Sequence, residues 1–421
     1  MNDSNLQNKL TLILITQSFP FGITESSFLK EEIKVLSRVY NVHIVSRNNQ
    51  DIQYVEVPDN VTLYRYNPSK DYKVLYLLIQ TLCSLSFYVE ILDIFRKKKS
   101  VISSIKKCMR VQMRMLHFKC FLKGVRNNIE GNTIWYSYWN DYSCFATTIV
   151  KRKGDFVICR LHGGDLYELD INNNYQPYKC LYNKNVDWFS FISYKGLSYF
   201  NDTYYDVSSK ASVNYLGVPE RVTSYNFTDR KDVKIISFSY VRDIKRIDKI
   251  VDALSIINEI KVKWVHIGGR YIFDQIKKYA HHKLNNKVNI DYEFLGEMKN
   301  EDALSYISKN EFDFLVNVSS TEGMPMTMME AFSMSLPVIG TKVGGVPEVI
   351  THGINGFLLD VDFSNEDLKK LLFNYVFLPF SSKCALRKNA KETWKLNFCD
   401  VSNYNSFVEL LINKFNNYET N

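Results

Sequence analysis

Residues 319–331 read Ser319-Ser320-Thr321-Glu322-Gly323-Met324-Pro325-Met326-Thr327-Met328-Met329-Glu330-Ala331, and this stretch decides the fold. It follows an apolar run of strand type, residues 314–318, and helix formers continue to residue 335. The turn at 322–325 therefore joins a strand to a helix, which Thr327 is expected to cap. A helix that begins at the carboxyl end of a parallel strand offers free N–H groups and a positive dipole end, which favour phosphate.

Two carboxylates flank this predicted helix start. Glu322 lies on the loop and Glu330 about one turn into the helix, where a carboxylate can accept hydrogen bonds from sugar or ribose hydroxyls. The next strand, 336–340, leads to a second turn, Val343-Gly344-Gly345-Val346-Pro347-Glu348. Its paired glycines permit close backbone approach, and Pro347 suits the start of another helix.

These motifs resemble the donor site of retaining glycosyltransferases of family 4, which have the GT-B fold. The resemblance rests on Glu322, seven intervening residues and Glu330, followed by Gly344-Gly345-Val346-Pro347-Glu348. It implies that Glu322 holds the donor sugar and takes part in catalysis, and that Glu330 holds the nucleotide ribose. It also implies donor contacts from Gly323, Met324, Pro325, Met326 and Thr327. The plain alternative is a surface helix with two solvated glutamates.

A length of 421 residues exceeds one hydrophobic core and suits two domains. We expect an α/β protein of GT-B type, with two facing Rossmann-like domains and a terminal helix that crosses back to the first. The predicted boundaries are 1–220 for the acceptor-side domain, 221–398 for the nucleotide-sugar domain and 399–421 for the terminal helix. Apolar residues at helical spacing between 394 and 415 predict that helix.

The opening of the chain predicts a strand–helix–strand unit, with strands at 10–16 and 42–46 and a helix at 26–38. It lacks the G-x-G-x-x-G fingerprint, which argues against a dehydrogenase. In the family that this sequence resembles, Gly22 would let the loop approach the donor phosphates. The alternative is an ordinary surface turn with Glu25 near the helix start.

A second informative stretch follows the strand at 156–161 and reads His162-Gly163-Gly164-Asp165. The carboxyl end of such a strand faces the ligand crevice of an open α/β sheet. The resemblance places the catalytic histidine, His162, at the reacting end of the donor sugar. Asp165 is expected to orient it or to bind acceptor hydroxyls. Tyr138, together with Trp139 and Tyr142, would form a sugar-stacking wall on the acceptor side, unless these rings are simply core.

The strand at 234–239 restarts the strand–helix alternation and marks the second domain. Lys245 lies at the mouth of the following helix, where a cation would pair with the donor diphosphate. The family carries an arginine where this chain has Tyr240. Either Arg242 substitutes for it from a nearby position, or the phosphates rely on Lys245 and helix dipoles alone. The resemblance thus implies that Lys245 and Arg242 bind the donor, and that Lys245 also acts in catalysis.

The formal charge of +8 is concentrated between residues 94 and 128, which carry eleven Lys or Arg and no Asp or Glu. They are Arg96, Lys97, Lys98, Lys99, Lys106, Lys107, Arg110, Arg114, Lys119, Lys123 and Arg126. With the interleaved apolar residues, the segment suits an amphipathic surface on anionic lipid, rather than nucleic acid. The apolar run at 74–89 is short for a membrane span and predicts a buried or half-inserted helix. A helix with a solvated basic face is the alternative.

Together these patterns predict a metal-independent hexosyl-type glycosyltransferase, with a nucleotide-sugar co-substrate and no other cofactor. It would transfer sugar with retention to a lipid-linked or polysaccharide acceptor, in capsule, exopolysaccharide or O-antigen synthesis. No secretory signal and no paired-cysteine pattern stand out, so we expect a cytoplasmic protein, peripheral at the inner face of the membrane. A non-catalytic GT-B scaffold, and a nucleotide-sugar epimerase or phosphorylase, remain alternatives. The sequence leaves open the donor sugar, base, acceptor, linkage and oligomeric state.

Overall fold

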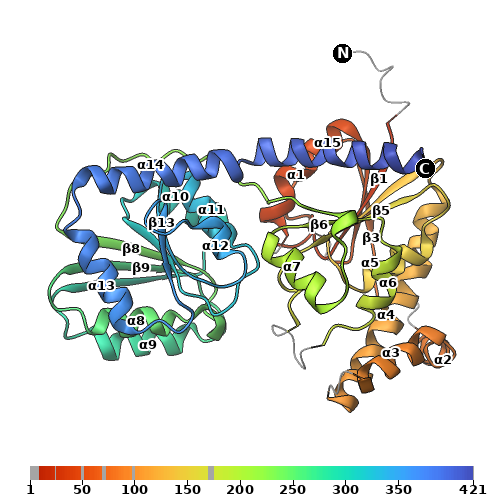
Figure 1. The fold of residues 1–421 in the computed structure, drawn as a ribbon, viewed down its shortest axis with the longest axis horizontal. Coiled ribbons are helices and arrows are strands. Elements are labelled where there is room, and N and C mark those ends of the chain that lie inside the picture. Colours follow the sequence, from red (N-terminus) through yellow and green to blue (C-terminus); the bar gives the residue numbers. More distant parts are fainter. Residues whose placement is uncertain are drawn as a thin grey trace. The chain divides into compact units, whose positions relative to one another are not determined.

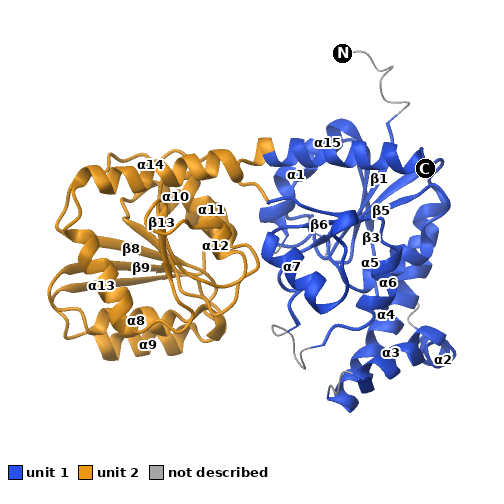
Figure 2. Cartoon of the chain, viewed as in Figure 1, with its two compact units in different colours: residues 1–215, 403–421 blue, residues 216–402 orange. Residues whose placement is uncertain are grey.

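The structure, a computed structural model, describes residues 9–23, 25–48, 52–68, 73–96, 100–168 and 175–420. The chain forms two compact units (Figure 2), of which unit 1 comprises residues 1–215 and 403–421 and unit 2 residues 216–402. The breaks thus fall after Tyr215 and Ser402, whereas the sequence places them after residues 220 and 398. Each unit is a parallel sheet with helices on both faces, an α/β architecture (Figure 1).

Unit 1 contains a seven-stranded sheet of order β3-β2-β1-β4-β5-β6-β7. The strands are β1 (Thr11–Thr16), β2 (Asn41–Ser46), β3 (Val61–Arg65), β4 (Thr133–Ser137), β5 (Phe156–Leu161), β6 (Trp188–Phe191) and β7 (Ala211–Val213). The helices are α1 (Ser26–Val39), α2 (Val74–Leu82), α3 (Leu85–Arg96), α4 (Val101–Asn127), α5 (Tyr142–Val150), α6 (Lys179–Tyr182), α7 (Tyr194–Thr203) and α15 (Asp400–Glu419), with short 3-10 turns η3 (Asn183–Asn185) and η4 (Ser208–Lys210).

Strand β1 is almost wholly apolar because both of its faces are covered. Leu12 and Leu14 pack in a core that also holds residues of α1 and α15. Ile13 and Ile15 point the other way, into a core with α3, α4 and α5. The predicted terminal helix is interrupted, since α14 ends at Asn397 and α15 begins at Asp400. Side chains of α15 complete the core of unit 1: Phe407, Val408, Leu411 and Phe415.

Unit 2 contains a six-stranded sheet of order β10-β9-β8-β11-β12-β13. The strands are β8 (Asp232–Phe238), β9 (Lys261–Ile267), β10 (Ile290–Gly296), β11 (Phe314–Asn317), β12 (Val338–Thr341) and β13 (Gly356–Leu359). The helices are α8 (Ile247–Ser255), α9 (Phe273–Leu284), α10 (Asn300–Lys309), α11 (Met326–Ser333), α12 (Val346–Val349), α13 (Asn365–Val376) and α14 (Phe380–Asn397), with the 3-10 turn η5 (Asp243–Lys245).

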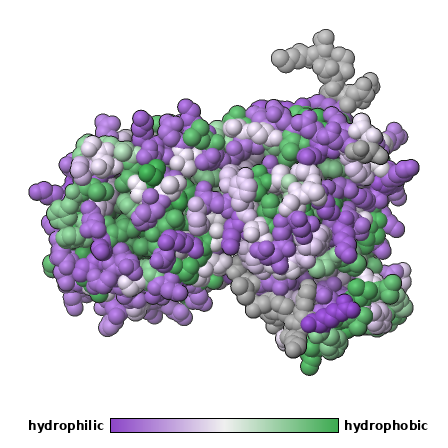
Figure 3. All heavy atoms as spheres, in the orientation of Figure 1, coloured by the Kyte–Doolittle hydropathy of each residue, from purple (hydrophilic) through white to green (hydrophobic). Residues whose placement is uncertain are grey.

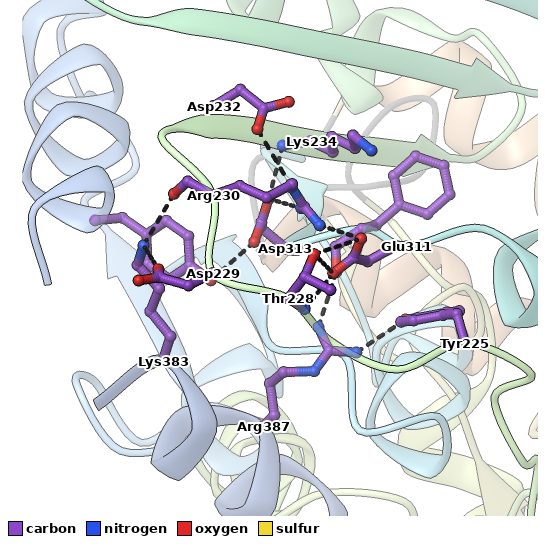
Figure 4. A network of polar contacts seen from close by, with 12 residues as sticks. Tyr225, Thr228, Asp229, Arg230, Asp232, Lys234, Glu311, Asp313, Lys383 and Arg387 are labelled. Atoms are coloured by element: carbon purple, nitrogen blue, oxygen red, sulfur yellow. Dashed lines mark hydrogen bonds and ion pairs between the residues drawn. The ribbon is translucent and has the colours of Figure 1, made fainter. Parts of the chain in front are cut away.

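A cluster of charged residues closes the amino edge of this sheet (Figure 4). Arg230 pairs with Asp313 at 2.8 Å, and Asp313 also accepts the backbone N–H of Lys234 at 2.8 Å. Arg387 of α14 donates to the hydroxyl of Tyr225 at 2.8 Å. These contacts fasten the segment before β8 to β11 and α14, so we assign the cluster a structural role.

The apolar run at 74–89 forms parts of α2 and α3, which meet at a bend of 67°. Among the residues described, no single helix is long and apolar enough to cross a membrane, although the bent pair together has the required length and composition. A buried or half-inserted helix was expected here, and the first of these is wrong, because most large apolar side chains of the pair are exposed. Partial insertion stays a prediction.

The basic segment forms much of helix α4, and its contact with anionic lipid stays a prediction. Helix α4 buries its apolar residues, including Met115, Phe118 and Leu122, in the core of unit 1. Arg126 is buried as well and pairs with Asp155 at 2.8 Å. Helix α4 thus has one face in the core of unit 1 and a second face with exposed Lys106, Arg110 and Arg114. Residues 97–99 lie outside the described part of the chain.

Candidate functional site

The candidate site of unit 2 lies where the strand order reverses, between β8 and β11. At such a switch point the loops after neighbouring strands diverge and leave a crevice at the carboxyl edge of the sheet. The β8 loop carries Lys245 and the β11 loop carries Glu322. Their side chains meet there, with Lys245 Nζ 2.5 Å from Glu322 Oε1.

One oxygen of Glu322 is committed and the other is available. Oε1 also accepts hydrogen bonds from Ser319 Oγ at 2.7 Å and Asn317 Nδ2 at 3.1 Å. Oε2 accepts none from any residue that the structure describes. The carboxylate is thus oriented by three donors and keeps one oxygen for a ligand hydroxyl.

Arg246 fixes the two loops against each other. It has a left-handed backbone, with φ of 50°, immediately before α8. Its guanidinium donates to the carbonyl oxygens of Val318 at 2.7 Å and Ser319 at 3.2 Å. Ser320 N–H donates to Ile244 O at 2.8 Å. The sequence analysis missed this positioning role, because nothing in the local pattern separates Arg246 from a solvated arginine.

Helix α11 begins at Met326, and its N-cap position is occupied by Pro325, two residues before the predicted cap and without a side-chain cap. The expectation that Thr327 caps the helix is therefore wrong, and Thr327 lies in its first turn. The first N–H groups of a helix have no intrahelical acceptor, so this turn can donate to an anion.

The paired glycines confirm the close backbone approach expected of them. A Cβ on Gly344, whose φ is +48°, would lie 1.6 Å from Glu322 O, and one on Gly345 would lie 2.5 Å from Gly323 O. Gly345 N–H donates to Gly323 O at 2.8 Å. The second turn thus supports the Glu322–Gly323 backbone directly.

Glu330 is buried on α11, where Asn300 Nδ2 donates to its Oε1 at 3.0 Å. Burial raises the pKa of the Glu330 carboxyl above 4.5, although Asn300 and Arg221 act in the opposite direction. A ligand hydroxyl that donates to this carboxylate would replace part of its lost hydration.

Two arginines stack on tyrosines beside the β8 loop. The guanidinium of Arg242 lies 5.1 Å from the ring centre of Tyr271, and that of Arg270 lies 4.7 Å from the ring centre of Tyr240. Arg270 pairs with Glu297, whereas Arg242 has no carboxylate partner among the residues described. Arg242 is thus the available cation of the two.

The switch point of unit 1 lies between β1 and β4 and contains a residue that the sequence analysis undervalued, Glu25. Its carboxylate is fully buried and accepts N–H groups from Gln17 and Phe19, both at 2.8 Å, and from Ser18 and Trp139 Nε1. Its position directly before a helix, after an irregular loop, was the one available signal.

Gly22 belongs to the same loop. A Cβ there would lie 2.5 Å from Ser18 Cβ, so the loop's own folding already requires a glycine. Its approach to donor phosphates stays a prediction.

His162 lies beneath aromatic rings at the carboxyl end of β5. Its ring centre is 4.4 Å from that of Trp139 and 4.8 Å from that of Tyr138. Neither imidazole nitrogen has a hydrogen-bond partner among the residues that the structure describes. Burial, and secondarily Arg160, place the pKa of His162 well below 6.5, so the imidazole is neutral at physiological pH.

This neutrality predicts a pH-dependent stability. Below pH 6.5 the unfolded chain protonates His162 while the folded chain does not, so stability falls as the pH falls. As the pH falls through that range, the free energy of unfolding of the wild type should fall by about 1.4 kcal/mol more per pH unit than that of His162→Phe. Urea unfolding at stepwise pH values measures this difference, with the exposed His282→Phe as control. Parallel pH profiles for the wild type and His162→Phe would contradict a buried neutral imidazole.

Asp165 joins the loops after β4 and β5, because its oxygens accept the backbone N–H groups of Asn140 at 2.6 Å and His162 at 2.7 Å. It therefore positions the main chain of His162 rather than the imidazole. Burial raises the pKa of Asp165 to about 6, against the effect of Lys179.

Tyr138 does not form part of a sugar-stacking wall, because its ring is fully buried in the core of unit 1. The half-exposed Trp139 borders a cavity of about 330 Å³ instead. Gln17, Tyr142, Asp165 and Gln176 also line this cavity, as do Lys107 and Val111 of α4.

The two units together have the GT-B architecture of glycosyltransferases. Solved structures with this fold include Anabaena HepE in complex with UDP, with a TM-score of 0.65 and 14% identity over 96% of this chain and 100% of that one. Sucrose-phosphate synthase from Thermosynechococcus elongatus has a TM-score of 0.68 and 15% identity, over 97% and 99% of the two chains.

Sequence comparison finds a match to a known family over part of the chain. Residues 224–393, which lie within unit 2, match the family model of glycosyl transferases group 1. N-acetyl-alpha-D-glucosaminyl L-malate synthase of Bacillus anthracis is 32% identical over 128 residues, 30% of this chain and 32% of that protein. The match therefore spans about a third of that relative's length.

Proposed function

We propose that this protein is a glycosyltransferase that moves a hexose-type sugar from a nucleotide diphosphate donor to an acceptor hydroxyl. The contact between Lys245 and Glu322 at the switch point of unit 2 carries the proposal. It puts a cation, an oriented carboxylate with a free oxygen and the N-terminus of α11 on adjoining loops. A diphosphate linked to a sugar has matching chemistry, with negative charge at one end and hydroxyl donors at the other.

In this proposal the leaving group is a nucleoside diphosphate, and stabilising its growing charge is the main catalytic task. Lys245, Arg242 and the N–H groups at the start of α11 supply that stabilisation. Glu322 holds the sugar through its hydroxyls, and Glu330 holds the ribose. Retention of anomeric configuration and independence from metal follow the resemblance to family 4 and are part of the proposal.

The cavity beside Trp139 is the proposed acceptor side. Asp165 and Trp139 would offer acceptor hydroxyls a carboxylate and an aromatic surface. A lipid-linked or polysaccharide acceptor at the inner face of the membrane fits the basic surface of α4. His162 would act from beneath Trp139, as a neutral group near the reacting sugar.

Tyr240 stands where the family carries an arginine. This one observation favours a second candidate, a non-catalytic scaffold of the same fold. The position of Arg242 weakens that argument, because its guanidinium is exposed and unpaired within the described part of the chain. A nucleotide-sugar epimerase or phosphorylase differs from the proposal in its products. Release of nucleoside diphosphate only when an acceptor is present distinguishes transfer from both.

Nucleotide binding tests the donor site directly. UDP, the nucleotide in the HepE structure, and GDP are titrated calorimetrically after a thermal-shift screen of UDP- and GDP-sugars. Lys245→Ala is expected to weaken binding of the preferred nucleotide about 10–100-fold, because it removes a charged contact to phosphate. Lys342→Ala is the matched control, since Lys342 forms an exposed pair with Asp360. Equal affinities of Lys245→Ala and wild type would contradict this site.

A further inference from the structure

Helices α2 and α3 turn their apolar faces outward. The exposed large apolar side chains of the pair recur at helical spacing, and they are Val74, Leu75, Tyr76, Ile79, Leu82, Leu85, Tyr88, Val89, Leu92 and Phe95. Figure 3 shows hydrophobic residues gathered over this part of unit 1. Leu85 is 78% exposed and Leu75 is 70% exposed, which is far from the burial expected of such residues.

The opposite faces of both helices are firmly held, so the outward faces are a fixed feature. Leu77 of α2 and Phe87 and Ile94 of α3 belong to the core of unit 1. At the bend, buried Gln112 of α4 donates to Ser84 Oγ and Ser86 Oγ, both at 3.0 Å. The exposed apolar surface is therefore a defined feature of the fold and not a result of poor packing.

Within the described helices α2, α3 and α4, every exposed charged side chain is basic. Lys106, Arg110 and Arg114 are exposed at intervals of four residues and form one stripe of α4, and Arg96 is exposed at the end of α3. The acidic residues of α3 are turned inward: Glu90 is buried and accepts the N–H of Tyr178 at 2.7 Å, and Asp93 is half-buried. An apolar surface with a basic border complements an anionic bilayer.

We propose that the α2–α3 pair inserts into the headgroup region of an anionic bilayer, while the basic stripe of α4 contacts lipid phosphates. This proposal deepens the proposed function and rests on it for the acceptor. Helix α4 supports the pair and also lines the 330 Å³ cavity through Lys107 and Val111. Insertion would thus bring the proposed acceptor cavity to the membrane, where a lipid-linked acceptor has its sugar.

A bilayer fits better than a protein partner for two reasons. The interior backbone groups of a helix bond within it, as lipid requires of a segment it surrounds, and in the headgroup region water can reach the groups at the helix ends. Tyr76 and Tyr88 add amphipathic rings of the kind that favour the membrane–water interface. A second copy of the chain is the main rival, and the experiment includes it.

Flotation with vesicles of phosphatidylcholine, with or without phosphatidylglycerol, tests the proposal without any need for enzyme activity. The wild type is expected to float with the anionic vesicles. The triple variant Leu75→Gln, Leu85→Gln, Leu92→Gln is expected to bind at least about tenfold more weakly, because three apolar side chains lose their insertion energy. The control carries as many exposed substitutions elsewhere, Val222→Gln, Leu396→Gln and Val401→Gln, and should float like the wild type.

Two outcomes would overturn the proposal: a wild type that does not float, and a triple variant that floats as well as the control. Concentration-dependent dimerisation without lipid, lost in the triple variant, would assign the surface to a second copy and also overturn it. Because nucleotide binding by unit 2 is measured separately, failure here leaves the donor site standing.

Exposed Cys83, between α2 and α3, gives a second measurement that changes no apolar residue. With Cys120 and Cys384 replaced by serine, an environment-sensitive fluorophore on Cys83 is expected to shift to the blue with anionic vesicles. The matched protein labelled on Cys384 instead should show no shift. Equal responses at both positions would contradict insertion of the α2–α3 pair.

Discussion

Replacement of Glu322 by alanine is expected to lower kcat/KM for sugar transfer about 10²–10⁴-fold, the largest catalytic effect among the site residues. The carboxylate would accept one or two hydrogen bonds from donor hydroxyls, and each charge-assisted bond is worth about 1.5–3 kcal/mol. Loss of the carboxylate also releases Lys245, now 2.5 Å from Oε1. Initial rates over a range of donor concentrations, with acceptor present, measure the effect.

The Glu322→Ala variant should distinguish the contribution of sugar binding from that of nucleotide binding. Because Glu322 is assigned to the sugar, Glu322→Ala should bind the free nucleoside diphosphate within about threefold of wild type, and Lys245→Ala should not. Asp360→Ala is the control, since Asp360 forms an exposed ion pair with Lys342 on a neighbouring loop. Full transfer activity of Glu322→Ala would contradict the assignment of Glu322 to the donor sugar, whereas a wild type that transfers no sugar would favour the non-catalytic scaffold.

Replacement of Asp155 by alanine is expected to destabilise unit 1 by about 3–5 kcal/mol, because it leaves a buried arginine without its counter-charge. Asp155 is completely buried and accepts from Arg126 at 2.8 and 3.0 Å, Trp135 Nε1 at 3.1 Å, and the N–H groups of Thr133 at 3.1 Å and Arg152 at 2.8 Å. Burial alone would raise its pKa, but these bonds hold the pKa of Asp155 below 3.8.

Urea unfolding of unit 1 measures this effect. The exposed pair of Lys34 and Glu31 provides the comparison, since Glu31→Ala should cost no more than about 1 kcal/mol. The double variant Arg126→Met, Asp155→Ala should recover part of the loss, because it removes the unpaired charge. Equal losses of unfolding free energy for Asp155→Ala and Glu31→Ala would show that the buried ion pair contributes no more to stability than the exposed one.

The local sequence pattern was sufficient to predict an element wherever a single physical cause acts over a short stretch of chain. Strands β1 and β11 were predictable as apolar runs because helices cover both faces of each sheet. The turn at 322–325 and the glycines at 344 and 345 were predictable because a strand-to-helix turn and a close backbone approach each restrict residue type. The contact between Lys245 and Glu322 was not predicted, because it depends on β8 and β11 being neighbours in the sheet.

The rest depends on contacts distant in sequence. In the sequence Arg126 resembles the other basic residues of its segment, and only the fold places Asp155 beside it. Glu25 looks like a surface glutamate until four N–H groups converge on it. The aromatic run at β4 does not reveal that Tyr138 points into the core and Trp139 toward the cavity. Similarly, hydrophobicity located α2 and α3 but did not show which way their apolar faces point.

The contribution of α15 to unit 1 has a consequence for biosynthesis. Translation delivers the strands of unit 1 first, then the whole of unit 2, and only then Phe407, Val408, Leu411 and Phe415. Until the ribosome has synthesised these residues, the nascent first unit leaves the apolar side chains that they cover exposed to solvent, while unit 2 can already close its own core. We therefore expect the nascent chain to need a chaperone that prevents its aggregation over that interval, and unit 1 to complete its folding last.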